Sequence, residues 1–120
     1  MKIRAIAIDD DPLATLLVEK LAKNNKNVEL IASYNDSVRG AAGIVLDRPD
    51  VLFLDIEMPE FNGIQIMGSM RQPPKVIVVS ANPTYTKEAL DLNAVTFINK
   101  PLNQETFDEA IEKVMELISV

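Results

Sequence analysis

Acidic side chains stand where two apolar runs of the sequence end. Asp9, Asp10 and Asp11 follow one run, and Asp55 follows another. Neighbouring carboxylates repel and raise one another's pKa, so they persist where water or a cation neutralises them. Mg²⁺ prefers oxygen ligands and is usually held by one or two carboxylates, so this pattern predicts a divalent cation site. The alternative is that these acids only cap the helices that follow, as Asp often does.

Two side chains that suit phosphate chemistry follow later apolar runs. Ser80 supplies a hydroxyl donor and Lys100 supplies a point charge. Transfer of a phosphoryl group to a carboxylate needs a nucleophile, a bridging cation and donors for the developing charge. Asp55 stands alone at the end of its run and is the natural nucleophile, while the small Ala81 leaves room beside Ser80. The alternatives are a helix N-cap for Ser80 and an ordinary surface lysine for Lys100.

The composition narrows the class of protein. The 120 residues suffice for one domain with one core. Cys and His are absent, which excludes disulfides, imidazole catalysis and most transition-metal sites. The net charge of −6 argues against direct nucleic-acid binding, which needs clustered Lys and Arg. No apolar stretch reaches the roughly 20 residues that cross a bilayer, and no signal-peptide pattern opens the chain. We therefore expect a cytoplasmic domain that does not contact membranes.

The segments that must position these side chains alternate between strand and helix. Leu13, Leu17 and Leu21 repeat at a helical spacing and predict one buried face, whereas Gly40 and Gly43 weaken the prediction of the second helix. Five strands that are each followed by a helix predict a doubly wound α/β fold, with a five-stranded parallel sheet covered on both faces. The acids, the serine and the lysine then meet at the carboxyl edge of the sheet. The expected strands cover 3–8, 28–34, 51–54, 76–79 and 95–98, and the expected helices begin near 12, 37, 62, 84 and 104.

Over essentially its full length the sequence resembles the receiver domain of two-component response regulators. The matching stretches, in the family's order, are Ile8–Leu13, Phe53–Pro59 with Gly63, Val79–Ala81 and Lys100-Pro101. The separations of 25 residues from Asp55 to Ser80 and of 20 from Ser80 to Lys100 are similar to those in receivers of LytTR-type regulators. The resemblance implies a (βα)5 fold with strand order 2-1-3-4-5. It also implies that residues 1–120 are a receiver, without the DNA-binding output domain that follows in such regulators.

The resemblance implies a metal role for four of the residues. Asp55 would be the phosphoacceptor and would also contact Mg²⁺. Asp10 would bind the ion directly, and Asp9 would hold it largely through water. The backbone carbonyl of Glu57 would complete the protein ligands. Asp11 is expected to be solvated or to cap the helix.

The remaining implied roles concern phosphate binding and switching. Ser80, Ala81 and Lys100 would bind the phosphoryl group, and Ser80 would move toward it while the aromatic side chain of Phe97 repacks inward. The alternative for Phe97 is a simple core position. Three further residues would be structural: Pro59 in the loop, Gly63 with its permissive backbone, and Pro101 after a cis peptide bond.

The expected function is phosphorelay signal transduction. A sensor histidine kinase or a phosphotransfer protein would phosphorylate Asp55, and the change would switch a partner-binding face. That face would favour a homodimer through the fourth helix, the fifth strand and the fifth helix. The domain would be no enzyme beyond self-catalysed phosphorylation and autodephosphorylation. Two alternatives stay open: a haloacid-dehalogenase-like phosphatase that uses Asp9 and Asp11, and a receiver-like interaction module that works without phosphorylation.

Overall fold

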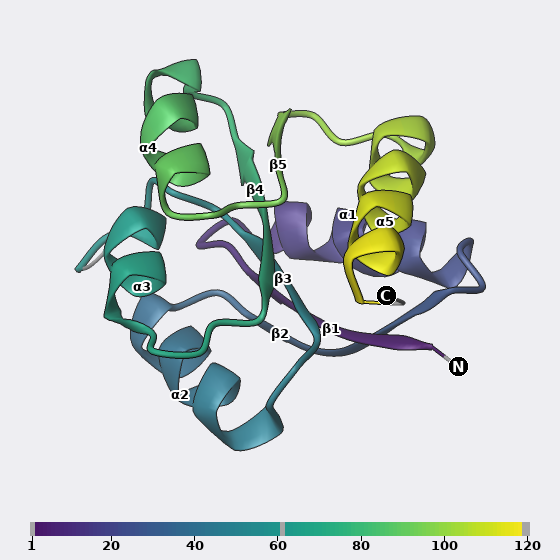
Figure 1. Cartoon of the computed structure of the whole chain (residues 1–120), viewed down its shortest axis with the longest axis horizontal. Coiled ribbons are helices and arrows are strands. Elements are labelled where there is room, and N and C mark those ends of the chain that lie inside the picture. Colours follow the sequence, from purple (N-terminus) through teal and green to yellow (C-terminus); the bar gives the residue numbers. More distant parts are fainter. Residues whose placement is uncertain (1, 61, 119–120) are drawn as a thin grey trace.

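Five parallel strands form one sheet in the order β2-β1-β3-β4-β5 (Figure 1). The computed structural model describes residues 2–60 and 62–118 of the chain. The doubly wound α/β fold and the strand order implied by the resemblance are confirmed. The strands are β1 (Ile3–Ile8), β2 (Val28–Tyr34), β3 (Val51–Leu54), β4 (Lys75–Ser80) and β5 (Thr96–Asn99).

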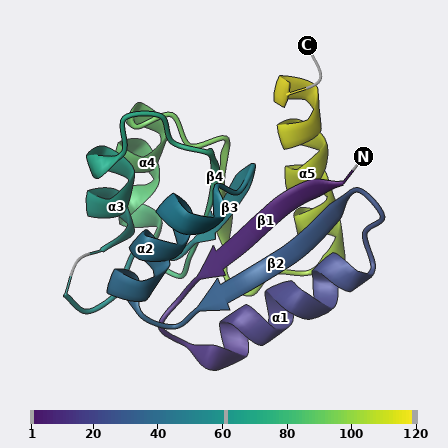
Figure 2. The ribbon, with the colours of Figure 1, turned by 90° about the horizontal axis from the view of Figure 1, so that it is seen from below.

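Helices connect the strands and cover both faces of the sheet. They are α1 (Pro12–Lys23), α2 (Ser37–Asp47), α3 (Gly63–Ser69), the 3₁₀ helix η1 (Pro83–Tyr85), α4 (Thr86–Asp91) and α5 (Gln104–Ile118). Figures 1 and 2 show α1 and α5 on one face, and α2, α3 and α4 on the other. A buried hydrophobic cluster lies on each face, and in one of them the rings of Phe53 and Phe107 stack with their centroids 5.0 Å apart. No helix in the described part of the chain combines the length and the apolar character that crossing a bilayer requires.

The strand register brings the carboxyl ends of four strands together. Ile8 of β1 is the partner of Leu54 in β3, and Leu54 is in turn the partner of Val78 in β4. Ser80 pairs with Asn99 at the end of β5. The strand order reverses beside β1, because the connection from β2 to β3 passes over β1 to its other side. Open parallel sheets bind ligands at such a switch point.

Two glycines let α2 lie close to the sheet. A Cβ atom built on Gly40 would lie 2.7 Å from Cγ2 of Ile8, and one on Gly43 would overlap the ring of Tyr34. A larger residue at either position would push the helix away. The weak helix propensity of these glycines is therefore offset by the close packing that they permit.

Several predicted boundaries and faces differ from the structure. The expected fourth helix begins with the 3₁₀ turn η1 at Pro83 and becomes α-helical only at Thr86. The fifth strand is displaced by one residue, to Thr96–Asn99. Leu13 was expected on the buried face of the first helix, but its side chain is 74% exposed. It lies in the first turn of α1, which extends past the edge of the core.

Candidate functional site

The loop after β1 presents its three acids in three different ways. Asp9 is buried, and its Oδ1 atom accepts a hydrogen bond from the backbone N–H of Asp11 at 2.9 Å. Asp10 is exposed. The Asp11 carboxylate accepts a hydrogen bond from the backbone N–H of Leu13 at 3.0 Å and caps α1. The capping role of Asp11 is therefore confirmed. Asp9 and Asp10 are left at the carboxyl edge of the sheet.

Two residues that the sequence interpretation missed hold this loop in place. The Asn35 side-chain amide donates hydrogen bonds to the backbone carbonyl of Asp9 at 2.8 Å and to the Thr15 hydroxyl at 3.0 Å. Thr15 is buried in α1. The available signal was the position of Asn35, which directly follows β2 at the same edge of the sheet. A polar residue there can reach the β1 loop, but its partner depends on the packing of α1.

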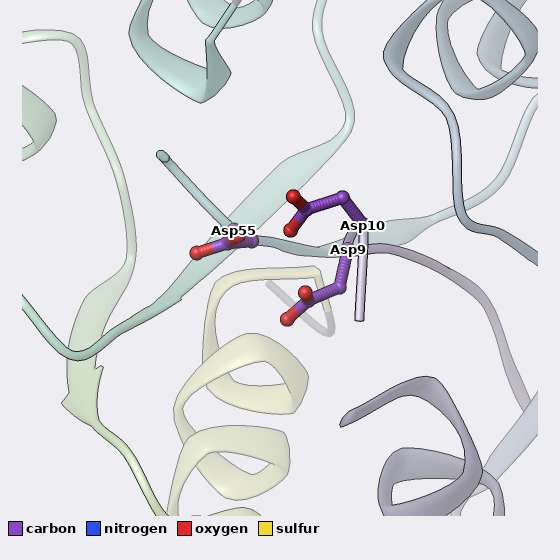
Figure 3. Close-up of side chains that lie close together, drawn as sticks. All are labelled: Asp9, Asp10 and Asp55. Atoms are coloured by element: carbon purple, nitrogen blue, oxygen red, sulfur yellow. The ribbon is translucent and has the colours of Figure 1, made fainter. Parts of the chain in front are cut away.

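Asp55 lies at the centre of an acidic cluster. It follows β3 and is only 5% exposed. Asp9, Asp10 and Asp55 each offer one oxygen atom, and these atoms lie within 4.8 Å of one another. Figure 3 shows the three side chains gathered where β1 and β3 end. Opposite ligands of an octahedral Mg²⁺ ion lie about 4 Å apart, so small movements of these side chains would fit them to the ion.

Gly63 serves this site by its small size. A Cβ atom built there would lie 2.5 Å from the backbone oxygen of Asp55 and 2.9 Å from Cα of Ile56. The Gly63 backbone N–H also donates a hydrogen bond to the Ile56 carbonyl at 2.8 Å. No described glycine has a positive φ. The predicted reason, permissive backbone geometry, is therefore wrong, and close backbone approach takes its place.

Lys100 carries its charge into the acidic cluster. Its ammonium nitrogen lies 2.9 Å from Oδ2 of Asp9 and 3.6 Å from Oδ1 of Asp55. Its backbone N–H donates a hydrogen bond to the Ser80 carbonyl at 3.1 Å. The peptide bond to Pro101 is cis, as expected. The alternative of an ordinary surface lysine is wrong, since the side chain is directed into the site.

The electrostatics of the cluster favour a proton or a cation on Asp55. Burial and the nearby Asp9 charge raise the pKa of Asp55 from 3.8 to about 7, with a smaller rise from Asp10. The Lys100 ammonium and a hydrogen bond from the Glu57 backbone act in the opposite direction. Burial alone would lower the pKa of Lys100, but the hydrogen bond to Asp9 and the surrounding carboxylates raise it. Lys100 therefore stays charged beside an acid that is easily protonated.

The loop after β4 engages Ser80 and crosses to the β3 loop. The Ser80 hydroxyl is buried and accepts a hydrogen bond from the backbone N–H of Asn82 at 3.1 Å. Asn82 caps η1 by accepting a hydrogen bond from the Thr84 N–H, so the alternative of Ser80 as the helix N-cap is wrong. The Asn82 amide also donates to the Glu57 carboxylate at 2.6 Å. The sequence interpretation gave the Glu57 side chain no role, and the structure gives it this contact. Ala81, between Ser80 and Asn82, is exposed.

The predicted switch and loop residues lie in the described part of the chain. Phe97 is half-buried and packs against the hydrophobic cluster beneath α3 and α4. It is neither a fully buried core residue nor a solvated one. The Pro59 carbonyl accepts a hydrogen bond from the Ser37 hydroxyl at 3.1 Å, which ties the β3 loop to α2. The position of Asp11 also weighs against the phosphatase alternative, because its carboxylate caps α1 and is not among the acids whose oxygen atoms cluster with those of Asp9.

Comparison with known sequences relates the chain to response regulators. The response regulator receiver domain family matches residues 5–112. The transcriptional regulatory protein LytR of Staphylococcus aureus is 30% identical over 115 residues, which cover 93% of this chain and 47% of that protein. The transcriptional regulatory protein BtsR of Escherichia coli is 25% identical over 116 residues, which cover 95% of this chain and 48% of that protein. The chain thus spans about half the length of these curated relatives.

Solved structures have the same fold along nearly the whole chain. The response regulator domain of Thermotoga maritima CheB has a TM-score of 0.86 and 26% identity, over 100% of this chain and 98% of that one. The receiver domain of AraT from Geobacillus stearothermophilus has a TM-score of 0.89 and 25% identity, over 99% and 97%. The phosphatase alternative is not favoured by any of these relatives. The chain belongs to the receiver domain family of two-component response regulators.

Proposed function

We propose that this receiver accepts a phosphoryl group on the carboxylate of Asp55. The observation that carries the proposal is the arrangement around that one side chain. Asp55 is buried between two further carboxylates and the Lys100 ammonium, at the switch point of a parallel sheet. A buried acid with a raised pKa beside specific charge partners is typical of a functional site. The donor would be a sensor histidine kinase or a phosphotransfer protein, the partners with which receivers of this family interact.

The acidic cluster fits a magnesium ion. Asp10, Asp9, Asp55 and the backbone carbonyl of Glu57 would hold it, with water completing its shell. When bound, Mg²⁺ supplies positive charge to the oxygens of the incoming phosphoryl group. Its charge would also oppose the effects of burial and of the Asp9 carboxylate, which raise the pKa of Asp55, so that the nucleophile is ionised at neutral pH.

The reaction transfers one phosphoryl group and needs no other reactant. A carboxylate oxygen of Asp55 forms a bond to phosphorus while the bond between phosphorus and the donor nitrogen breaks, and the electron pair leaves with that nitrogen. Lys100 is already 3.6 Å from Asp55 and would contact a phosphoryl oxygen. The Ser80 hydroxyl, which accepts a hydrogen bond from the Asn82 N–H, would donate its own proton to another phosphoryl oxygen, while Ala81 leaves space for the group. Beyond this self-catalysed transfer and the later hydrolysis, we assign no enzymatic activity.

An apolar surface beside the acidic cluster suits the phosphodonor protein. Leu13 and Leu16 on α1 are 74% and 58% exposed. Leu13 lines a cavity of about 210 Å³ that is formed by the first turns of α1, Asp55 and residues 100–102, and Leu16 lies one turn further along α1. A helix of the donor packed on these leucines would bring its phosphorylated histidine to Asp55 and exclude water from the transfer. This explains why α1 exposes leucines at the end nearest the site.

The output would follow from a change in the loops after β4 and β5. Ser80 would close on the phosphoryl group, and Phe97 would move into the space that it vacates. The face that these movements can remodel consists of α4, β5 and α5, and we propose receiver dimerisation through it. We take residues 1–120 as a receiver unit that works in the cytoplasm. By analogy with the relatives named as transcriptional regulators, its signal would control transcription through a separate DNA-binding element.

Intact mass spectrometry tests the proposal. Incubation with Mg²⁺ and acetyl phosphate should add one phosphoryl group to the chain. Asp55→Asn should abolish the addition, whereas Asp91→Asn, which alters an exposed acid on α4, should leave it unchanged. Equal labelling of the wild type and of Asp55→Asn would refute Asp55 as the acceptor, and no labelling of the wild type would favour an interaction module that works without phosphorylation.

A further inference from the structure

The end of the sheet opposite Asp55 carries an open groove of about 1250 Å³. It lies between α2 and α3, which are neighbours in both Figure 1 and Figure 2. It also extends below the amino ends of β1, β3 and β4 to the last turn of α5, where Met115 and Ile118 line it. We call it the α2–α3 groove. Its apolar lining includes Ile44 and Val45 of α2, Ile66 of α3, and Met70. Pro49, Pro73 and Pro74 restrict the backbone of its walls.

The outer face of α2 extends the apolar surface of this groove. Val38, Val45 and Leu46 are 50%, 73% and 79% exposed, although they belong to a helix whose inner face already packs on the sheet. A surface helix normally has a polar outer face, and a helix that is apolar all round is usually covered. Contiguous exposed apolar side chains often mark an interaction site. Val45 belongs both to this face and to the groove.

The charges at the groove define the chemistry of a ligand. Three of its four charged lining residues are the cations Arg48, Arg71 and Lys75, in a chain whose net charge is −6. The fourth, Asp50, accepts a hydrogen bond from the backbone N–H of Arg4 at 2.8 Å. Among the described residues, none of the three cations forms an ion pair. They are therefore available to an acidic partner.

We propose that the α2–α3 groove binds an acidic amphipathic helix of a partner protein. The apolar stripe of that helix would contact Val45, Ile44 and Met70, and its Asp and Glu side chains would pair with the three cations. An extended strand fits less well, because β1, β3 and β4 are paired on both sides and offer no free edge. A helix satisfies its own backbone hydrogen bonds. Nucleic acid fits less well because the floor is apolar and the whole chain is acidic.

This inference goes beyond the phosphoacceptor role. The groove lies at the amino ends of the strands and uses none of the residues proposed for phosphoryl transfer. Binding there would let the receiver hold a partner whether or not Asp55 is phosphorylated. The two proposals can therefore fail separately, since phosphorylation of Asp55 can be measured in every groove variant.

The test uses the ¹⁵N-labelled chain and two synthetic peptides that are roughly four helical turns long. Both have Leu at helical spacing along one face, and their polar positions are Glu in one peptide and Lys in the other. The Glu peptide should shift the amide signals of residues 41–48 and 66–75, and the Lys peptide should not. Absence of shifts with the Glu peptide, or equal binding of both peptides, would overturn the proposal.

Matched variants test the apolar and the charged parts separately. Val45→Glu and the double variant Arg71→Glu/Lys75→Glu should each weaken binding of the Glu peptide by about tenfold. Leu90→Glu and Lys87→Glu/Lys113→Glu make the same chemical changes on α4 and α5, outside the groove, and should not weaken it. All variants should still be phosphorylated at Asp55, which shows that they fold. Equal weakening by the control variants would overturn the assignment of the groove.

Two other occupants give different results. A second copy of the chain would appear as concentration-dependent sedimentation that Arg71→Glu/Lys75→Glu removes. A single-stranded oligonucleotide that shifts the same amides more than the Glu peptide does would identify a nucleic-acid site. Either result would overturn the partner-helix proposal.

Discussion

The Lys100 ammonium lies 2.9 Å from an oxygen of Asp9 and 3.6 Å from an oxygen of Asp55, so that one cation is shared by two buried carboxylates. Buried charges of one sign are costly unless a partner neutralises them. Burial and the neighbouring Asp9 charge outweigh the effect of this single lysine, so the pKa of Asp55 remains raised to about 7. The same imbalance makes the site receptive to a divalent cation.

Removal of the lysine charge should make Asp55 a weaker acid. Lys100→Met keeps much of the side-chain volume but removes the charge that lowers the pKa of Asp55, so this pKa should rise further above about 7 in Mg²⁺-free buffer. Titration of the Asp55 carboxyl carbon by NMR measures the shift. Lys87→Met, on the exposed face of α4, is the matched control and should leave the titration unchanged. An unaltered pKa in Lys100→Met would show that the ion pair is not formed in solution.

The stability of the Mg²⁺-free chain should depend on pH through Asp55. Its pKa is raised from 3.8 to about 7 on folding, so the folded state binds the proton more tightly than the unfolded state does. This contribution is fully present below about pH 4 and is lost as the pH rises toward about 7. Asp55→Asn mimics the neutral acid and lacks the effect. As the pH rises across this range, the free energy of unfolding of the variant should therefore increase relative to that of the wild type, by up to about 4 kcal/mol.

Urea denaturation at several pH values, with EDTA and with Mg²⁺, measures that difference. Mg²⁺ should stabilise the wild type and narrow the gap, because it binds the folded state through the carboxylates. A gap that does not change between pH 4 and pH 7 would contradict the raised pKa of Asp55.

Mg²⁺ binding should distinguish two adjacent acids. Asp10 is exposed and offers an oxygen to the acidic cluster, whereas the Asp11 carboxylate caps α1. Asp10→Ala should weaken Mg²⁺ binding by at least about tenfold, the loss that even a residue outside the ligand shell can cause. Asp11→Ala should mainly lower stability, by about 1 kcal/mol for the lost cap. Calorimetric titration gives the affinities, and equal losses in the two variants would favour a site that uses Asp11.

Two glycines of α3 should respond in opposite ways to the same substitution. At Gly63 a Cβ atom would meet the backbone of Asp55 and Ile56, so Gly63→Ala should destabilise the chain by roughly 1–3 kcal/mol. At Gly68 nothing lies within 4 Å, and Gly68→Ala should stabilise it by up to about 1 kcal/mol. Thermal denaturation measures both. A neutral Gly63→Ala would show that the β3 loop has room to move.

The location of the charged site residues could be predicted from the sequence. Asp9, Asp10, Asp55 and Lys100 could be placed at one edge because apolar runs and alternating helices identify a parallel sheet, and parallel strands end at the same edge. The cis peptide bond before Pro101 was also anticipated, from the family resemblance.

Contacts between loops could not be predicted from the sequence. The Asn82–Glu57 hydrogen bond joins residues 25 positions apart, and the Asn35–Thr15 hydrogen bond depends on how α1 packs. Nothing in the residue types alone selects these partners over water. The role of Gly63 was misjudged for a similar reason, because φ is a local property, whereas the approach of the β3 backbone is a tertiary one.

The output proposal predicts a response far from Asp55. In this structure the Ser80 hydroxyl accepts a hydrogen bond from the Asn82 N–H, so its own O–H is available to donate to a phosphoryl oxygen. Beryllofluoride, which mimics the phosphoryl group, should then shift amide signals in α4, β5 and α5 and promote dimerisation. Ser80→Ala removes the donor and should reduce the fraction in the switched state by roughly tenfold, since a hydrogen bond to a charged group contributes about 1.5–3 kcal/mol. Sedimentation and NMR measure the two effects. Shifts confined to the loops around Asp55, with none in residues 84–118, would refute the switch, because a ligand can move an equilibrium only through its different affinities for the two states.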